Sequence, residues 1–283
     1  MNGAVVVVVA AALLGVYQAP SEAEVAQRVH PAGAVSVAAR LVDVTQPFLD
    51  APYVLSPLGE GSGVDPDPRL RFDAFDCTTF VETAMALALG KDLDDARLVL
   101  DHLRYQNGVV EFSARRHFPE AEWIPQLTTL GIIVDVTRAV GGAAVKAETK
   151  KLDATVWKKT RHKGLPILAD ERIPSGVFSL DVWPLNDAAA HADRIPAGTI
   201  LHLVRVDFAN VPVRVSHQGL VLEKDGKKFM RHAADRLHHR VVDEPLDRFF
   251  ARMKLYGKWP VTGVHLTTLQ PPPDWRQRLG LPP

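Results

Sequence analysis

The strongest constraint on the fold of this chain is a helix that carries the only cysteine of the sequence at its first turn. From Thr78 to Leu89 the apolar residues recur at three- and four-residue spacing, which predicts a helix with one apolar face. Asp76 is expected to cap the start of this helix, and Gly90 suits its end. Cys77 is therefore predicted to lie where a helix presents free backbone N–H groups.

The remaining pattern divides the chain into an early helical part and a late β-rich part. A second helix is expected over 93–103, after an interrupted helical stretch over 23–50. The segment 141–161 is rich in lysine and is expected to be a surface helix. Strands are expected over 109–112, 132–137, 199–206, 213–222, 227–233, 241–243 and 261–266. Helices early and antiparallel strands late predict an α+β fold.

The composition excludes several classes of function. Lys plus Arg and Asp plus Glu number 33 each, so the net charge does not point to nucleic acid as a partner. A single cysteine excludes an intrachain disulfide framework and a CxxC-type zinc site. No cofactor is expected.

The N-terminus predicts export. Residues Ala4 to Val16 form an apolar run that is too short to span a bilayer and is typical of a secretory signal, with small residues around Ser21–Ala23 for cleavage. No Lys or Arg precedes Arg28, so a buried N-terminal element of a cytosolic protein is the alternative. We expect a signal peptide over 1–23, one domain over 24–270 with an insertion at 141–195, and a mobile proline-rich tail over 271–283. The mature protein is then periplasmic or in the cell envelope, without stable insertion in the membrane.

Cys77 is a candidate nucleophile. The thiolate is the reactive form of cysteine, and a position at a helix N-terminus lowers the thiol pKa. The same N–H groups can stabilise the oxyanion of a tetrahedral intermediate. The alternative is that Cys77 is a small buried apolar residue.

A predicted hairpin brings two histidines together. Asp225-Gly226 is a two-residue turn signal, and the resulting register puts Gly219 opposite His232. His217 and His232 then lie on one face as diagonal neighbours, where His217 can act as a base and His232 can orient its ring. The alternatives are two unrelated histidines, or a longer turn that would separate them onto opposite faces.

These segments, taken in order, resemble the N-acetylmuramoyl-L-alanine amidase-like (DUF1460) family of the NlpC/P60 papain-like superfamily. The matching motifs are YVLSPLGEG from Tyr53, FDCTTFVE from Phe75, RHF with EWI around Arg116 and Trp123, IPAGTI from Ile195, SHQG around His217, and HA at His232. The resemblance implies a cysteine-bearing helix packed on an antiparallel sheet or half-barrel that carries the histidines. It also implies that Cys77 is the nucleophile, His217 the base and His232 the third polar residue.

The resemblance implies a peptidoglycan or muropeptide substrate, cut at the amide between N-acetylmuramic acid and L-alanine. Related enzymes cut the γ-D-glutamyl–diaminopimelate bond instead, and composition leaves both open. Residues assigned to substrate binding on this basis are Tyr53, Glu60, Asp76, Arg116 and Trp123. Arg116 is a candidate anchor for a peptide carboxylate, while Tyr53 and Trp123 are candidates to shape the cleft. The alternatives are a structural ion pair for Arg116 and core packing for Trp123.

Two further functional classes remain open from the sequence. One is a zinc amidase that uses Cys77, His217 and His232 as ligands, although no dense metal-ligand motif is present. The other is a wall-binding domain without activity.

Overall fold

The computed structural model describes residues 17–29, 35–159 and 168–282. The apolar run from Ala4 to Val16, on which the expected signal peptide depends, lies outside the described residues. No helix in the described part of the chain is both long enough and apolar enough to span a bilayer.

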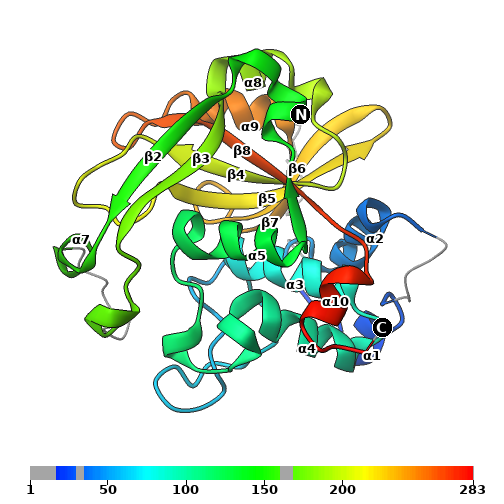
Figure 1. Ribbon diagram of the computed structural model, residues 1–283. Helices are drawn as coiled ribbons and strands as arrows, with labels where there is room; N and C mark the ends of the chain where they lie inside the picture. The colour runs from blue at the N-terminus through cyan, green and yellow to red at the C-terminus, as the bar shows by residue number, and fades with distance from the viewer. Residues whose placement is uncertain (1–16, 30–34, 160–167, 283) are drawn as a thin grey trace, which may run out of the picture.

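An antiparallel sheet forms the centre of the molecule (Figure 1). Its strands follow the order β2-β3-β8-β4-β5-β6-β7, and β1 pairs with β8 outside this path. The strands are β1 (Ile133–Asp135), β2 (Lys146–Leu152), β3 (Gly176–Pro184), β4 (Thr199–Arg205), β5 (Val215–Lys224), β6 (Lys227–Ala234), β7 (Arg240–Pro245) and β8 (Val261–Leu269). Successive strands are joined mostly by short connections from β4 onward, as the β-rich pattern of this half predicts.

Helices cover both faces of the sheet (Figure 1). One face is covered by a helical layer that includes α2, α3, α4, α5 and α10, and the opposite face by α8 and α9. The helices are α1 (Glu22–Ala26), α2 (Val37–Thr45), α3 (Cys77–Leu89), α4 (Leu93–Arg104), α5 (Ile124–Leu130), α6 (Thr137–Gly141), α7 (Ala154–Lys159), α8 (Leu185–Ala190), α9 (Leu246–Met253) and α10 (Asp274–Arg278). The chain is thus a mixed α+β protein, as predicted from its sequence.

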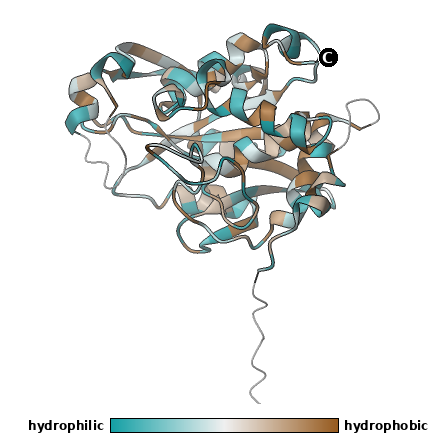
Figure 2. Ribbon diagram, turned by 90° about the horizontal axis from the view of Figure 1, so that it is seen from below, coloured by the Kyte–Doolittle hydropathy of each residue, from teal (hydrophilic) through white to brown (hydrophobic). Residues whose placement is uncertain are grey.

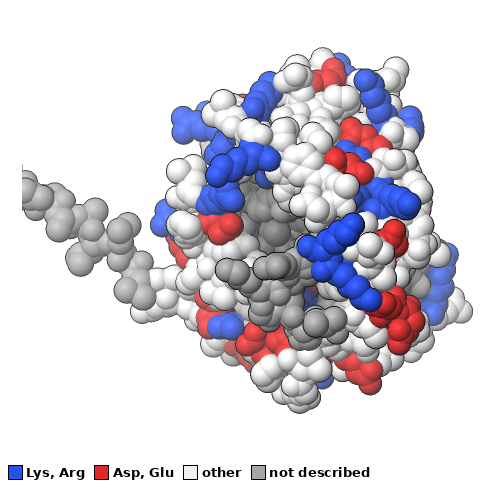
Figure 3. All heavy atoms as spheres, turned by 90° about the vertical axis from the view of Figure 1, so that its left-hand side faces the viewer, with Lys and Arg blue, Asp and Glu red and all other residues white. Residues whose placement is uncertain are grey.

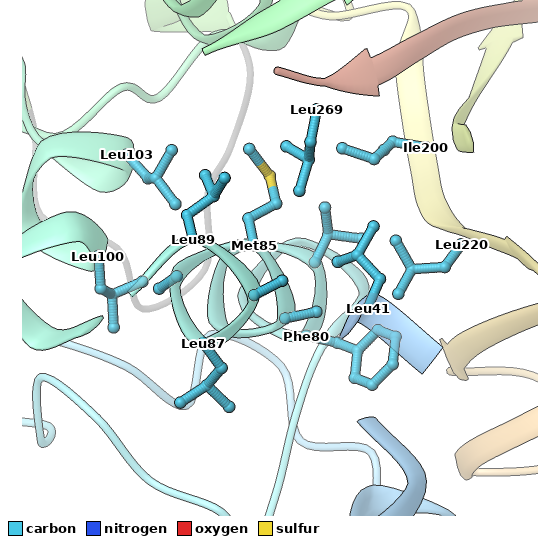
Figure 4. Packing of buried hydrophobic residues seen from close by; sticks show 14 of the residues in the cluster. Leu41, Phe80, Met85, Leu87, Leu89, Leu100, Leu103, Ile200, Leu220 and Leu269 are labelled. Atoms are coloured by element: carbon cyan, nitrogen blue, oxygen red, sulfur yellow. The ribbon is translucent and has the colours of Figure 1, made fainter. Parts of the chain in front are cut away.

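Helix α3 is the core of the helical layer. Every residue from Thr79 to Leu89 is buried, which explains why this helix is apolar on nearly all sides rather than along a single stripe. Figure 4 shows Met85 of α3 pointing toward the sheet, where Leu269 and Ile200 lie. This packing fixes the position of the first turn of α3 against the sheet.

Strand β5 contributes to the cores on both faces of the sheet. Leu220 and Leu222 belong to the core shared with α3, whereas Val221 between them belongs to the core shared with α9. Successive side chains of a strand point to opposite faces, so the even-numbered residues of this stretch face α3 and the odd-numbered ones face α9. Hydropathy follows the layers, with hydrophilic colour on the outer surfaces of many helices (Figure 2).

The expectation of a surface helix over 141–161 is wrong for most of that segment. Residues Lys146–Leu152 form β2, which pairs with β3, and only the short α7 follows. Burial alternates here in the manner of a strand, since Lys150 and Leu152 are buried and Lys151 between them is exposed. Lysine at position 150 is tolerated because its Nζ lies 2.6 Å from a carboxylate oxygen of Asp207. The expected strand over 109–112 is also absent, because Val109–Glu111 is irregular and Phe112 begins a short 3₁₀ turn.

The expected mobile tail is instead packed against the helical layer as far as it is described. Helix α10 buries Trp275, whose side chain belongs to the core that includes α3, and its Nε1 donates to the carbonyl of Gln270 at 3.2 Å. Arg276 is also buried and forms an ion pair with Asp95 in the first turn of α4. The proline-rich composition suggested a mobile tail, but Trp275 anchors this segment in the core.

Charge is mixed over the face that β2 and β3 present. Lys and Arg side chains alternate there with Asp and Glu (Figure 3), in keeping with equal totals of both signs. The described side chains of this face therefore do not form the single-sign field that would attract a polyanion.

Trp275→Ala is expected to lower the free energy of unfolding by about 3–5 kcal/mol, because it removes a large side chain from a packed core. Denaturant unfolding followed by circular dichroism measures this change. Gln277→Ala, in the same helix but exposed, is the matched control and should change stability by less than about 0.5 kcal/mol. Equal effects of the two substitutions would show that α10 is not anchored through Trp275.

Candidate active site

The start of α3 is held by Asp76. Its Oδ1 accepts the backbone N–H of Thr79 at 2.7 Å, and its Oδ2 accepts that of Ser56 at 2.9 Å. The Asp76 carbonyl accepts the N–H of Phe80. The backbone N–H groups of Cys77 and Thr78 are the first two of the helix and have no intrahelical acceptor. Asp76 thus fixes the turn on which Cys77 lies, and among the described residues no backbone carbonyl accepts the N–H groups of Cys77 and Thr78.

Cys77 is partly buried against β5. Its Sγ lies 4.0 Å from the Thr78 hydroxyl. Burial and the neighbouring Asp76 carboxylate raise the pKa of the thiol to about 12, although the backbone of Gln218 and the Thr78 hydroxyl act in the opposite direction. The lowering that a helix N-terminus was expected to produce is therefore outweighed by desolvation. Cys77 rests as a neutral thiol at neutral pH.

The predicted register of the β5–β6 hairpin is confirmed. Lys224 pairs with Lys227 and Leu220 with Arg231 across the turn. Gly219 lies against His232, where an added Cβ would approach the His232 Cβ to 2.8 Å. The Nε2 atom of His217 lies 2.7 Å from the Nδ1 atom of His232, so the two rings share one hydrogen bond.

A carboxylate and an arginine extend this histidine pair. The Nε2 atom of His232 lies 3.2 Å from Oε2 of Glu244, and the Arg252 guanidinium donates to the same carboxylate, with Nε at 2.9 Å from Oε1. Phe249 packs its ring against both histidines, at centroid distances of 6.3 and 5.5 Å. The structure thus contains a continuous chain from His217 through His232 and Glu244 to Arg252.

Sequence reasoning missed Glu244, Phe249 and Arg252. Strand β7 pairs with β6 so that His232 lies opposite Val242, and Glu244, two residues further, shares its face. Helix α9 follows directly and carries Phe249 and Arg252. The available signal was the alternation in Val242–Glu244 together with the apolar spacing of Leu246, Phe249 and Phe250.

Burial keeps the histidines neutral. The pKa of His217 is well below its usual value because its ring is desolvated, and the neighbouring His232 lowers it further. Burial also lowers the pKa of His232, against the opposing effect of Glu244. The Glu244 carboxyl has a pKa of about 2, because the hydrogen bonds from His232 and Arg252 outweigh its burial.

Cys77 and His217 approach β5 from different sides. The Gln218 side chain faces α3, where its Nε2 donates to the Thr78 hydroxyl at 3.2 Å, whereas the His217 ring stacks on Phe249 of α9. Cys77 therefore meets β5 at the residue next to His217. Within the described part of the chain, Cys77 and His217 share no hydrogen bond, and the Nδ1 atom of His217 has no hydrogen-bond partner. Contacts between reacting groups are often long in the absence of substrate.

Two of the five residues assigned to substrate binding lie beside Cys77. Asp76 directly precedes it and caps its helix. Tyr53 is half-buried, and its pKa is raised by burial and by the nearby charges of Cys77, Asp76 and Asp235. Tyr53 also joins the Phe75 segment through a backbone bridge.

The other three residues are held in structural contacts. Glu60 is buried in an ion pair with Arg115 at 2.5 Å. Arg116 donates from Nη1 to the carbonyls of His102, Leu103 and Tyr105, and from Nε to Gln126. Trp123 is 2% exposed and donates its Nε1–H to Glu82 at 3.0 Å. Trp123 is therefore packed in the core, as its alternative interpretation expects, and the Nε and Nη1 donors of Arg116 are used within the protein.

The described residues contain no group of three or more His, Cys, Asp or Glu side chains that could hold a metal ion. In particular, Nε2 of His217 and Nδ1 of His232 are engaged with each other. The donor set that a zinc amidase would need is thus not assembled among these residues.

The fold and site define a mixed α+β protein in which a helix-borne cysteine meets an antiparallel strand next to a hydrogen-bonded pair of histidines, of which His232 is buried and His217 is partly exposed. The family model described as N-acetylmuramoyl-L-alanine amidase-like matches residues 43–257, which include Cys77, His217 and His232. The chain belongs to this N-acetylmuramoyl-L-alanine amidase-like family.

Solved structures support the same fold. A Legionella pneumophila protein of the DUF1460 family matches with a TM-score of 0.77 at 20% identity, covering 88% of this chain and 94% of its own. An N-acetylmuramoyl-L-alanine amidase from Bacteroides uniformis matches with a TM-score of 0.66 at 22% identity, covering 83% and 99%. No curated protein matches the chain. At these identities the structural likeness defines the fold alone.

Glu244→Gln is expected to reduce stability at neutral pH and to flatten its dependence on acid. The folded-state pKa of Glu244 is depressed from 4.5 to about 2, so its contribution is present above pH 4.5 and is lost as the pH falls toward 2. The substitution should therefore cost at most about 3 kcal/mol at pH 7, and much less at pH 2. Urea unfolding at a series of pH values measures the difference between the two proteins. A difference that stays constant from pH 7 to 2 would contradict this coupling.

Proposed function

We propose that this protein is an exported cysteine amidase that hydrolyses peptidoglycan or muropeptides at the amide between N-acetylmuramic acid and L-alanine. The observation that carries the proposal is the position of Cys77 on the first turn of α3, against the strand that carries His217. Membership of the amidase-like family supports a peptidoglycan-related substrate and a location in the cell envelope. The NlpC/P60 papain-like relationship is part of the same proposal.

The proposed reaction uses Cys77 and His217 in two steps. His217 takes the thiol proton at Nδ1, and the sulfur attacks the carbonyl carbon of the amide. The tetrahedral intermediate then collapses as His217 gives this proton to the departing nitrogen, which leaves a thioester on Cys77. In the second step His217 takes a proton from water and the resulting hydroxide attacks the thioester carbonyl. The C–S bond then breaks, the acyl part leaves as a carboxylic acid, and His217 returns the proton to the sulfur to restore the thiol.

Neutral resting groups fit a mechanism in which proton transfer accompanies attack. Because burial disfavours both the Cys77 thiolate and the His217 imidazolium, the free enzyme does not contain a thiolate–imidazolium ion pair. The negative charge then develops on the oxyanion, for which the N–H groups of Cys77 and Thr78 are available donors. His232 and Glu244 hold the Nε2 side of the His217 ring, which leaves Nδ1 for the reaction.

The alternative within the same mechanism is cleavage of the γ-D-glutamyl–diaminopimelate bond. Both reactions transfer an acyl group to a cysteine, so the residues near Cys77 support them equally. Mass spectrometry of defined muropeptides after incubation reads the cleaved bond directly. Release of intact L-alanyl peptides supports the amidase, release of diaminopimelate-containing fragments supports the endopeptidase, and binding without products supports a wall-binding domain.

Cys77→Ala is expected to reduce hydrolysis of muropeptides by at least about a thousandfold while leaving the fold unchanged, since removal of a nucleophile eliminates the covalent route.

His217→Ala should lower kcat by about 10²–10⁴-fold, the usual contribution of a general base. His232→Ala should cost less, about 10–100-fold, because it acts by orienting the His217 ring. His191→Ala, in a partly exposed histidine outside this site, is the matched control. Turnover by Cys77→Ala at the wild-type rate would rule out the mechanism.

The acid limb of the pH profile of kcat/KM is expected below pH 6.5. His217 must be neutral to accept a proton, and its depressed pKa keeps it neutral below the usual titration range of histidine. Initial rates on one muropeptide between pH 4 and 9 measure this limb. A limb at or above pH 6.5 would show that another group, or an ion pair, controls the activity.

A further inference from the structure

A cavity of about 270 Å³ opens beside the histidine pair, on the α9 side of the sheet. His217 and His232 form part of its wall, and Cys77 does not line it. Around these histidines the cavity is lined by Arg205, Ser216, Arg236, Tyr256, Lys258 and Trp259. The cavity therefore begins at the proposed base, and Cys77 lies outside its lining.

The wall of this cavity carries positive charge that the protein itself does not neutralise. Among the described residues, no carboxylate forms an ion pair with Arg205, Arg236 or Lys258. Arg252 also lines the cavity, but Glu244 neutralises it. Asp235 is the one acidic side chain among the described lining residues. Three cations facing one acid form an environment that favours an anion.

Arg205 is the most constrained of these cations. Its guanidinium lies over the rings of Tyr256 and Trp259, at 4.8 and 5.2 Å from their centroids. Its Nε donates to the Ser216 hydroxyl at 2.6 Å, and Nη1 donates to the Trp259 carbonyl. Among the described residues Nη2 has no hydrogen-bond partner. Arg205 is only 9% exposed, so it is a buried, oriented cation with one donor nitrogen left over.

The charges of Arg205 and Arg236 act on each other. Burial lowers the pKa of Arg205, and the positive charge of Arg236 lowers it further, against the opposing effect of Tyr256. A bound anion would relieve both the desolvation and this repulsion. The planar guanidinium fork of arginine can bind both oxygens of a carboxylate, which the ammonium group of lysine cannot do in this way.

The position of the cavity indicates which part of a substrate it receives. A base that takes the proton of the thiol must deliver it to the departing nitrogen, so that nitrogen lies against His217. Tyr53, which pairs with the segment that precedes Cys77, donates its backbone N–H at 2.9 Å to the carbonyl of His239, in the same β6–β7 connection that carries Asp235 of the cavity wall. The group attached to the departing nitrogen is therefore adjacent to the cavity.

We propose that this cavity is the subsite for the peptide on the amine side of the scissile bond, and that Arg205, Arg236 and Lys258 bind its carboxylates. The inference rests on the proposed function and deepens it, because it assigns specificity to the leaving peptide. The ligand class is a short acidic peptide such as L-alanyl-D-glutamate. Tyr256 and Trp259 hold the Arg205 guanidinium in orientation and give the cavity an apolar wall.

The test compares N-acetylmuramoyl-L-alanyl-D-glutamate with its uncharged diamide. Arg236 and Lys258 are exposed, so the double variant Arg236→Gln/Lys258→Gln preserves the buried contacts of Arg205. We expect this variant to raise KM for the dicarboxylate about tenfold, with kcat nearly unchanged and the diamide unaffected. Arg248→Gln/Lys254→Gln removes two exposed charges from α9 and the residue that follows it, outside the cavity, and is the matched control. Arg205→Lys, which keeps the charge and loses the fork, should raise KM for the dicarboxylate in the same direction.

Calorimetric binding of the product L-alanyl-D-glutamate provides a readout that does not depend on hydrolysis. Weaker binding in the double variant, with loss of the preference over the product diamide, supports the subsite even if the protein cuts neither muropeptide; the proposed function would then fail alone. Cys77-dependent hydrolysis with equal KM for both substrates in wild type and variant overturns the subsite and leaves the proposed function standing. A fall in kcat for both substrates to the same extent also overturns it.

Discussion

The contact between the first turn of α3 and strand β5 is the constraint on which the rest of the structure depends. Residues Thr79–Leu89 are buried between the sheet and the other helices, so α3 cannot shift without opening the core. The first turn then lies against Gln218, whose side chain donates to the Thr78 hydroxyl. Cys77 is positioned by packing against Gln218, and His217 is positioned by its place in β5 as the residue next to Gln218, with its ring on the α9 side of the strand.

The second element of the site is a polar chain built into an apolar core. The His217–His232 hydrogen bond, the Glu244 carboxylate and the Arg252 guanidinium satisfy one another beneath Phe249. A buried polar group is costly without partners, and a fully connected network fixes ring orientations that water would leave mobile. This hydrogen-bonded network lies on the α9 face of the sheet, beside the basic cavity. It therefore connects the proposed proton transfer with the proposed recognition of an acidic peptide.

Much of this arrangement could be predicted from local patterns, and the exceptions have physical causes. The Asp225-Gly226 turn fixed a two-residue hairpin, and counting in steps of two then placed His217 and His232 on one face. Arg116 and Trp123 could not be placed in the same way, because neighbouring sequence does not show which buried carbonyls or acids will meet a long side chain. The thiol pKa was mispredicted because helix-dipole reasoning ignores desolvation by distant residues. Lys150 and Trp275 also depend on residues far away in the sequence. The ion pair with Asp207 lets Lys150 be buried in strand β2 of a lysine-rich segment, and core packing of Trp275 anchors the proline-rich C-terminal segment.

The most direct test of the account is to identify the residue that carries the acyl group during turnover. Acid quenching of wild-type protein with a muropeptide, followed by peptide mapping in a mass spectrometer, measures this. The account predicts a thioester on the sulfur of Cys77 whose added mass equals the acyl part of the substrate after loss of the leaving peptide. An acyl group attached to any other residue would contradict it.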